Sequence, residues 1–229
     1  MMTFYSAVGR YRLKTENGRK VPYIQKLGKL HPISIPEFYI WSTLLWEVMT
    51  YQELKEYYDR IRCDSGIKMP ELDQMLDLLV SRKLVLKGIG YTGADALYDM
   101  LSDAFVVPFR MNALKRAWNA LRLWVRGRLS FRDLSRVVKP MKDPASETES
   151  VVCKLVRQTP LSTAELIRCL DRGILDVSTP DKVIAGIYPE YESDQLHIAN
   201  EQVHSQNRSA VLEAVSNLYL SRRVILETC

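Results

Sequence analysis

The chain has 229 residues, of which 47% are hydrophobic and 26% charged, and its formal net charge is +5. This composition is typical of a globular protein and excludes a disordered chain. No run reaches the roughly 18–20 apolar residues that cross a bilayer, and the stretch MMTFYSAVGRYRLK lacks the apolar core of a signal peptide. We therefore expect a soluble, cytoplasmic protein without a membrane span, whose modest charge permits a polyanionic partner without requiring one.

The first predicted element is a β-hairpin. RYRLKTENGRKVPYIQ (10–25) contains an Asn-Gly pair between two alternating runs, a strong signal for a tight hairpin turn. We expect it to pack against the domain that follows and assign residues 1–33 to an N-terminal β-hairpin extension.

Three helices are predicted next. They are SIPEFYIWSTLLWEV (34–48), TYQELKEYYDRI (50–61) and MPELDQMLDLLVSRK (69–83). The first two begin with S/T-x-x-E capping boxes, Ser34 to Glu37 and Thr50 to Glu53, in which a hydroxyl and a carboxylate satisfy free backbone N–H groups. Apolar residues at helical spacing give each segment one inward face.

The stretch LVLKGIGYTGADALYDML (84–101) has two readings. Gly88, Gly90 and Gly93 form G-x-G-x-x-G between a strand-like and a helix-like run, as in a dinucleotide site. That site also needs a βαβ unit with an acidic residue about 20 positions on. The only candidate strand, AFVVPF (104–109), comes too soon and ends at Arg110. We favour the second reading, a short hairpin turning on Gly88 and followed by a helix from Thr92, in which the glycines supply backbone freedom.

The next segment is strongly basic. Residues 106–142 carry ten Lys or Arg and one acid, Asp133. Leu114, Trp118, Leu121 and Val125 form an apolar stripe. The segment reads as a basic amphipathic helix with a second short helix from Ser130. It could be a packing helix, a phosphate-contacting surface or a membrane-surface helix. KPMKDPASETES (139–150) is the best linker candidate.

The chain then repeats itself. LLVSRKLVL (78–86) matches LYLSRRVIL (218–226) at an offset of 140 residues, and TYQELKEYYDRI resembles STAELIRCLDRGI (162–174) at an offset of 112. ETESVVCKLVRQ (147–158) occupies the place of the first helix, and Ser162 with Glu165 forms another capping box. The second copy lacks the glycines, which favours a structural role for them in the first copy.

Each half therefore reads as helix, helix, helix and strand pair. This pattern resembles the winged-helix fold, and its first copy resembles MarR- and PadR-type regulators over about residues 36–103; the resemblance over 147–229 is weaker. It implies a mainly α fold with small β-hairpins (α+β), made of two winged-helix units joined by a basic helical connector. The expected domains are 34–104, a connector at 105–146, and 147–229 with an insertion at about 174–206.

A winged-helix protein that recognises DNA places its third helix in the major groove. The third helix of the first copy exposes Glu71, Asp73 and Asp77, which would repel phosphates and instead suggest protein contact. The second copy and the connector offer amide, hydroxyl and basic side chains as candidates for nucleic-acid binding: Gln206, Asn207, Arg208, Ser209, Asn217, Arg222, Arg223, Lys115, Arg122, Arg126 and Arg128.

No catalytic motif of the serine-hydrolase, P-loop or zinc-protease type occurs. His197, Glu201 and His204 share one face if the insertion is helical, but we interpret them as an exposed polar face, not a metal site. The spacing of the four cysteines indicates neither a disulfide framework nor zinc. We expect no cofactor and no enzymatic activity. The favoured function is a regulator that binds double-stranded DNA, with protein contact or self-association through the first domain. The alternatives are a protein-binding scaffold or adaptor and a plasmid-type replication initiator.

Overall fold

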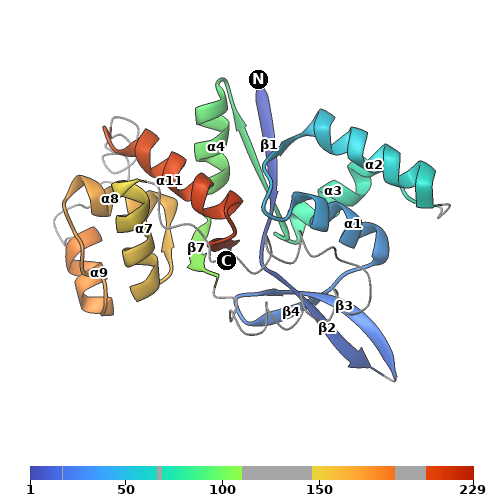
Figure 1. Cartoon of the computed structure of the whole chain (residues 1–229), viewed down its shortest axis with the longest axis horizontal. Coiled ribbons are helices and arrows are strands. Elements are labelled where there is room, and N and C mark those ends of the chain that lie inside the picture. The colour runs from blue at the N-terminus through green and yellow to red at the C-terminus, as the bar shows by residue number, and fades with distance from the viewer. Residues whose placement is uncertain (17, 66–68, 110–145, 189–204) are drawn as a thin grey trace, which may run out of the picture.

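A computed structural model describes residues 1–16, 18–65, 69–109, 146–188 and 205–229. Within these ranges the chain forms eight helices and three antiparallel sheets of three strands each. The mixed α+β class expected from the sequence is confirmed at this level. Figure 1 shows one group of helices on either side of a central region that contains β1 and α4.

The first unit is built around its N-terminal strand. Its elements are β1 (Met2–Ala7), α1 (Ile35–Leu44), β5 (Met49–Thr50), α2 (Tyr51–Ser65), α3 (Leu72–Ser81) and β6 (Val85–Gly90). β1 lies between β5 and β6 in one sheet. The predicted capping boxes are confirmed: Glu37 N–H donates to Ser34 Oγ at 3.4 Å, and Glu53 N–H donates to Thr50 Oγ1 at 3.4 Å, with the reciprocal bonds present in both.

The second unit has the same order of elements with one added helix. It comprises β7 (Phe105–Pro108), α7 (Glu147–Gln158), β8 (Leu161–Ser162), α8 (Thr163–Asp171), α9 (Pro180–Ile187), α11 (Arg208–Leu220) and β9 (Val224–Glu227). β7 lies between β8 and β9. The central strand of each sheet therefore precedes its unit's first helix, so the predicted boundaries at 34 and 147 leave both central strands outside their units.

The strand registers of the two units match residue for residue. The pairs on either side of each central strand are Phe4 with Thr50 and Gly88, and Phe105 with Ser162 and Glu227. At the junction after the third helix, Lys83 and Arg222 both adopt positive φ, and the next residue donates to Leu79 or Leu218. The offset there is 139 residues, so the predicted offset of 140 is wrong by one. Burial explains the difference, because Leu79 and Leu218 are both fully buried whereas Leu78 is exposed.

The predicted hairpin turning on Gly88 is wrong. Residues 85–90 form a single strand, β6, paired along its length with β1, and neither Gly88 nor Gly90 has positive φ. The helix α4 (Gly93–Leu101) follows and packs directly on β6. A Cβ at Gly88 would lie 2.2 Å from the Ala96 carbonyl oxygen, and one at Gly90 would lie 2.3 Å from the Ala96 nitrogen. The glycines are required for close approach of a helix to a strand, not for a turn.

The topology also rejects the dinucleotide reading of the same stretch. β6 pairs with β1, whereas β7, the next strand, belongs to the sheet of the second unit. The order strand, glycines, helix, strand is therefore not a βαβ unit within one sheet, which a Rossmann-type site requires.

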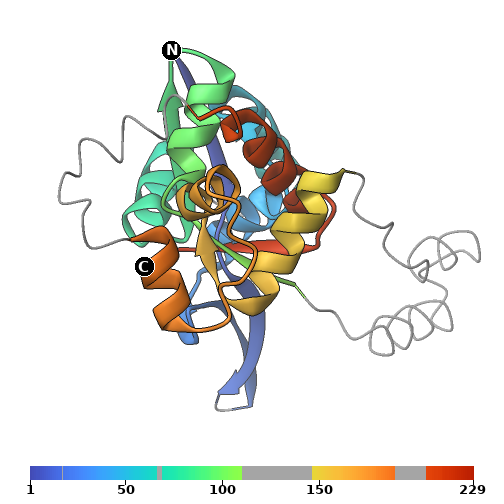
Figure 2. The same ribbon diagram turned by 90° about the vertical axis from the view of Figure 1, so that its left-hand side faces the viewer.

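The third sheet is the predicted hairpin with one further strand. It contains β2 (Arg10–Glu16), β3 (Arg19–Lys26) and β4 (Lys29–Pro32), in that order. Glu16 of β2 pairs with Arg19 of β3, which confirms the predicted hairpin. Its base packs on the first unit, where Ile24 is fully buried and the rings of Tyr11 and Phe38 lie 5.0 Å apart. Figures 1 and 2 both show β2 and β3 extending away from the body.

The two units share an extensive buried contact. α4 follows the first unit in sequence, but its residues Met100 and Leu101 belong to the hydrophobic core of the second. Tyr219 of α11 is 2% exposed, and its hydroxyl accepts from the Trp46 amide at 2.9 Å and from Ser6 Oγ at 3.0 Å. Gly9 N–H donates to the Leu226 carbonyl at 2.8 Å. None of the helices in the described ranges is both long and apolar enough to cross a bilayer.

Candidate nucleic-acid interface

The segment that forms the β2–β3 hairpin and the following turn is strongly basic. Residues 10–29 contain seven Lys or Arg and one acid, an excess larger than the net charge of the whole chain. Residues directly opposite in an antiparallel pair lie on the same face, so Arg10, Arg12 and Lys14 share a face with Gln25 and Tyr23. We call this the basic face of the hairpin. Arg12 and Lys14 are exposed, and so is Lys20, which lies on the opposite face.

Contacts within the basic face hold its side chains in place. The Arg12 Nε donates to Gln25 Oε1 at 2.8 Å, and the Lys14 ammonium lies 6.0 Å from the centre of the Tyr23 ring. Lys14 also forms an ion pair with Glu16 at 2.9 Å. All of these groups are solvent-accessible, so a phosphate could replace the neutral or acidic partner at little cost.

Three of the side chains predicted to read bases in the second unit have partners within the protein. Arg208 stacks over the Tyr98 ring at 4.2 Å and lies 3.5 Å from Asp95, both in α4. Asn207 donates to Asp171 at 2.8 Å, and Asn217 donates to Glu149 at 3.1 Å. These contacts join α11 to its neighbours.

The two predicted arginines after α11 lie close to other parts of the fold. Arg222 is exposed but lies over the ring of Trp46, with 5.2 Å between its guanidinium carbon and the ring centre. Arg223 hydrogen-bonds the Cys153 thiol, whose pKa is raised, chiefly by burial. Arg222 thus links the second unit to the first, and Arg223 links β9 to α7.

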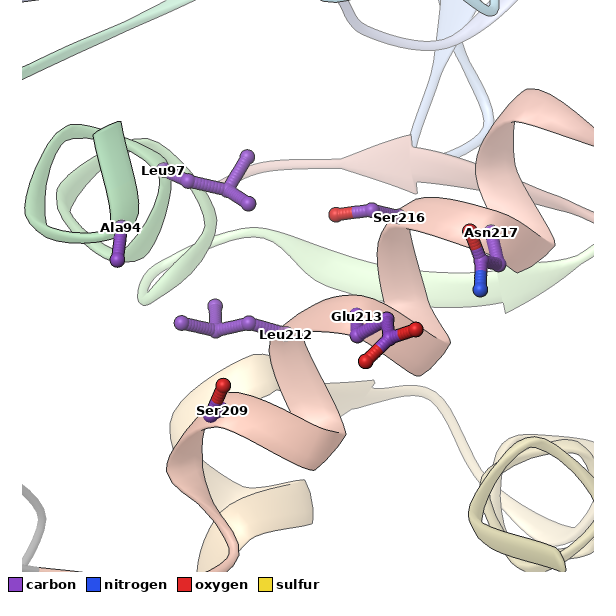
Figure 3. Close-up of a pocket in the computed structure, with 7 residues that line it drawn as sticks. All are labelled: Ala94, Leu97, Ser209, Leu212, Glu213, Ser216 and Asn217. Carbon is purple, nitrogen blue, oxygen red and sulfur yellow. The ribbon is translucent and has the colours of Figure 1, made fainter. Parts of the chain in front are cut away.

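Ser209 and Asn217 lie on a groove between α4 and α11, together with Glu213 (Figure 3). The groove encloses about 300 Å³ and is mostly apolar, with Ala94 and Leu97 on the α4 side. α11 packs against α7, α8 and α4. It is therefore a central helix, flanked on several sides, and not a projecting one. Gln206, next to its N-terminus, is exposed.

The acidic residues predicted for protein contact lie where expected. Glu71, Asp73 and Asp77 are exposed along α3. Tyr51 donates to Asp73 at 2.6 Å, and this bond is the main cause that raises the pKa of Tyr51 to about 12. No Lys or Arg occurs within α3, so this helix repels polyanions.

Part of the predicted site lies outside the described residues. Lys115, Arg122, Arg126 and Arg128 of the connector belong there, as do His197, Glu201 and His204 of the insertion. Within the described ranges, no group of three or more His, Cys, Asp or Glu side chains has the arrangement of a metal site. The four cysteines are free; Cys153 and Cys169 are buried, and burial raises the pKa of the Cys169 thiol to about 11.

The charge of the hairpin is a feature that the sequence motifs did not reveal. The turn was evident from the sequence, but the charge was not singled out because the connector carries more cations. Counting charge over 10–29 would have revealed it. Comparison with protein-family models, curated proteins and solved structures gave no match.

Proposed function

We propose that this protein is a non-catalytic DNA-binding regulator, in which two winged-helix units form the body and the β2–β3 hairpin contacts duplex DNA. The units support the winged-helix assignment through their order of helix, short strand, helix, third helix and strand. They depart from the expected pattern in one respect. The strand that pairs with β6 or β9 precedes the first helix instead of returning through a hairpin after the third.

One observation carries the proposal: a two-stranded ribbon with a large excess of positive charge projects from the body (Figure 2). Seven residues of strand extend roughly 24 Å, and the major groove of B-DNA, about 12 Å wide, admits a two-stranded β-ribbon. Cations on such a ribbon contact phosphates on both sides of the groove, which supplies affinity but not sequence preference.

The hairpin is better placed for this role than either third helix. α3 carries three exposed carboxylates, and α11 is flanked by other helices while its polar side chains have internal partners. DNA is therefore expected on the hairpin side of the molecule. The acidic face of α3 is left for a protein partner or a second copy of this chain, which is the feature that favours the scaffold as the second candidate function.

Changing Arg12, Lys14 and Lys20 together to alanine is expected to weaken binding to random duplex DNA. Each lost phosphate contact lowers the slope of log K against log salt by about 0.9, so the slope falls by up to about three. Fluorescence anisotropy at several salt concentrations measures it. The matched control changes Lys55, Arg60 and Arg62 of α2, which are equally exposed. Equal slopes for the two triple variants would remove the hairpin from the interface, and absence of binding at low salt would favour the scaffold.

The connector is tested in the same assay. Changing Arg122 and Arg126 to alanine is expected to lower the salt slope by up to about two if both contact phosphates. An unchanged slope in this variant would show that the connector does not contact DNA and would leave the hairpin as the main contact.

A further inference from the structure

At the base of the hairpin, a cluster of cations surrounds a lysine that lacks a partner. Lys26 is 9% exposed. It pairs with Lys29 across the β3–β4 turn, and His31 lies on the same face of the strand pair, opposite Ile24. Within the described ranges, the ammonium group of Lys26 makes no hydrogen bond and no ion pair. A covered charge of this kind is costly unless an opposite charge compensates it.

The His31 side chain also lacks a hydrogen-bond partner: its Nε2 atom is buried and makes no hydrogen bond in the described part of the chain. Burial lowers the pKa of His31, and the positive charges of Lys26, Arg82 and Lys29 lower it further. Burial likewise lowers the pKa of Lys26, followed by the charge of Lys83. The strands and the end of α3 thus bring five basic side chains together.

The glutamate carboxylates near this cluster form hydrogen bonds or ion pairs with other groups. Glu37 pairs with Arg82 at 2.6 Å and accepts from the Ser34 amide at 2.7 Å. Glu227 accepts from the Leu27 amide at 2.6 Å, and although its charge favours protonated Lys26, the two form no ion pair. Arg82 is neutralised by Glu37, which leaves Glu227 and the acidic group of Cys229 as the negative charges that act on Lys26.

We propose that Lys26, Lys29, His31 and Lys83 form a binding site for a phosphate group. Lys26 and Lys29 supply point charges, and His31 supplies a ring nitrogen that can donate from Nε2 to a phosphate oxygen. The phosphate could belong to a DNA backbone or be a free anion. Binding of DNA backbone phosphate at this site rests on the proposed function, because the cluster adjoins the base of the hairpin. Binding of a free anion does not depend on the proposed function.

The test follows the ring C–H resonances of His31 by NMR during titration with inorganic phosphate at constant ionic strength. The variant His31→Asn assigns these signals among the three histidines of the chain. We expect a saturable shift in the wild type. In Lys26→Met the dissociation constant is expected to rise at least tenfold. Because methionine replaces a desolvated charge with an apolar chain of similar length, this variant should fold.

Lys55→Met is the matched control, since Lys55 is an exposed cation of α2 outside both the cluster and the hairpin, and it should bind inorganic phosphate as the wild type does. A non-saturable response in the wild type, or equal binding by Lys26→Met, overturns the proposal. A second titration with duplex DNA separates the sources. If DNA causes a saturable shift of the His31 resonances and Lys26→Met abolishes this shift, the site binds backbone phosphate. A shift with inorganic phosphate alone assigns it to a free anion, and DNA binding by the hairpin is then judged by its own salt slope.

Discussion

Replacement of Gly88 by alanine is expected to destabilise the protein by about 3 kcal/mol, the upper end for overpacking a core. The added methyl group would lie 2.2 Å from the Ala96 carbonyl oxygen and 2.4 Å from the Met100 Cβ. Both belong to α4, so the helix as a whole must shift away from β6. Because Met100 and Leu101 also contribute to the core of the second unit, the shift disturbs both halves. Denaturant unfolding of purified variants measures the loss.

Gly93→Ala is the matched control within the same G-x-G-x-x-G stretch. Gly93 is the first residue of α4, and the atoms nearest to an added Cβ are at 3.7 Å or more. Alanine also favours the helix over glycine, so this variant should be as stable as the wild type or slightly more stable. If Gly88→Ala and Gly93→Ala unfolded at the same denaturant concentration, the close packing of α4 on β6 would be refuted.

Tyr219→Phe is expected to cost about 2 kcal/mol, because it leaves the partly buried backbone amide of Trp46 without its acceptor and removes the buried bond from Ser6. These groups belong to the other unit, so the loss weakens the contact between the halves. Tyr188→Phe serves as the control; its hydroxyl donates to Glu165 at 2.9 Å in an exposed position, and its removal should cost well under 1 kcal/mol. Similar losses of unfolding free energy for the two variants would show that the Tyr219 hydroxyl does not stabilise the contact between the two units.

The pH dependence of stability provides an independent check on Tyr219. Burial raises its pKa from 10.0 to about 12. A group whose pKa is higher in the folded state contributes stability that is complete below pH 10 and is lost as the pH rises toward 12. The difference in stability between the wild type and Tyr219→Phe should therefore shrink from pH 9 to pH 12. A constant difference would contradict this account.

Much of the local structure followed from the sequence alone. The Ser34, Thr50 and Ser162 helix starts were predictable because a capping box satisfies backbone groups within four residues. The Asn-Gly hairpin was predictable because its turn restricts the backbone over two residues. The duplication was visible because a similar helix-to-strand sequence recurs in both halves, although the predicted offset of 140 was one residue too long. In each case the interactions that decide the structure lie within a few residues of one another.

The tertiary structure decided what distant segments do to one another. The sequence around Gly88 is compatible with a turn and with close packing of a helix. Only the position of α4 distinguishes these two roles. β1 became the centre of a sheet by pairing with β6 about 80 residues later. Arg208 was predicted to read bases and Arg222 to contact phosphates, but α4 and Trp46 placed aromatic rings beneath them. Such pairings depend on which surfaces remain unburied after the local elements have formed, and no local pattern in the sequence encodes that choice.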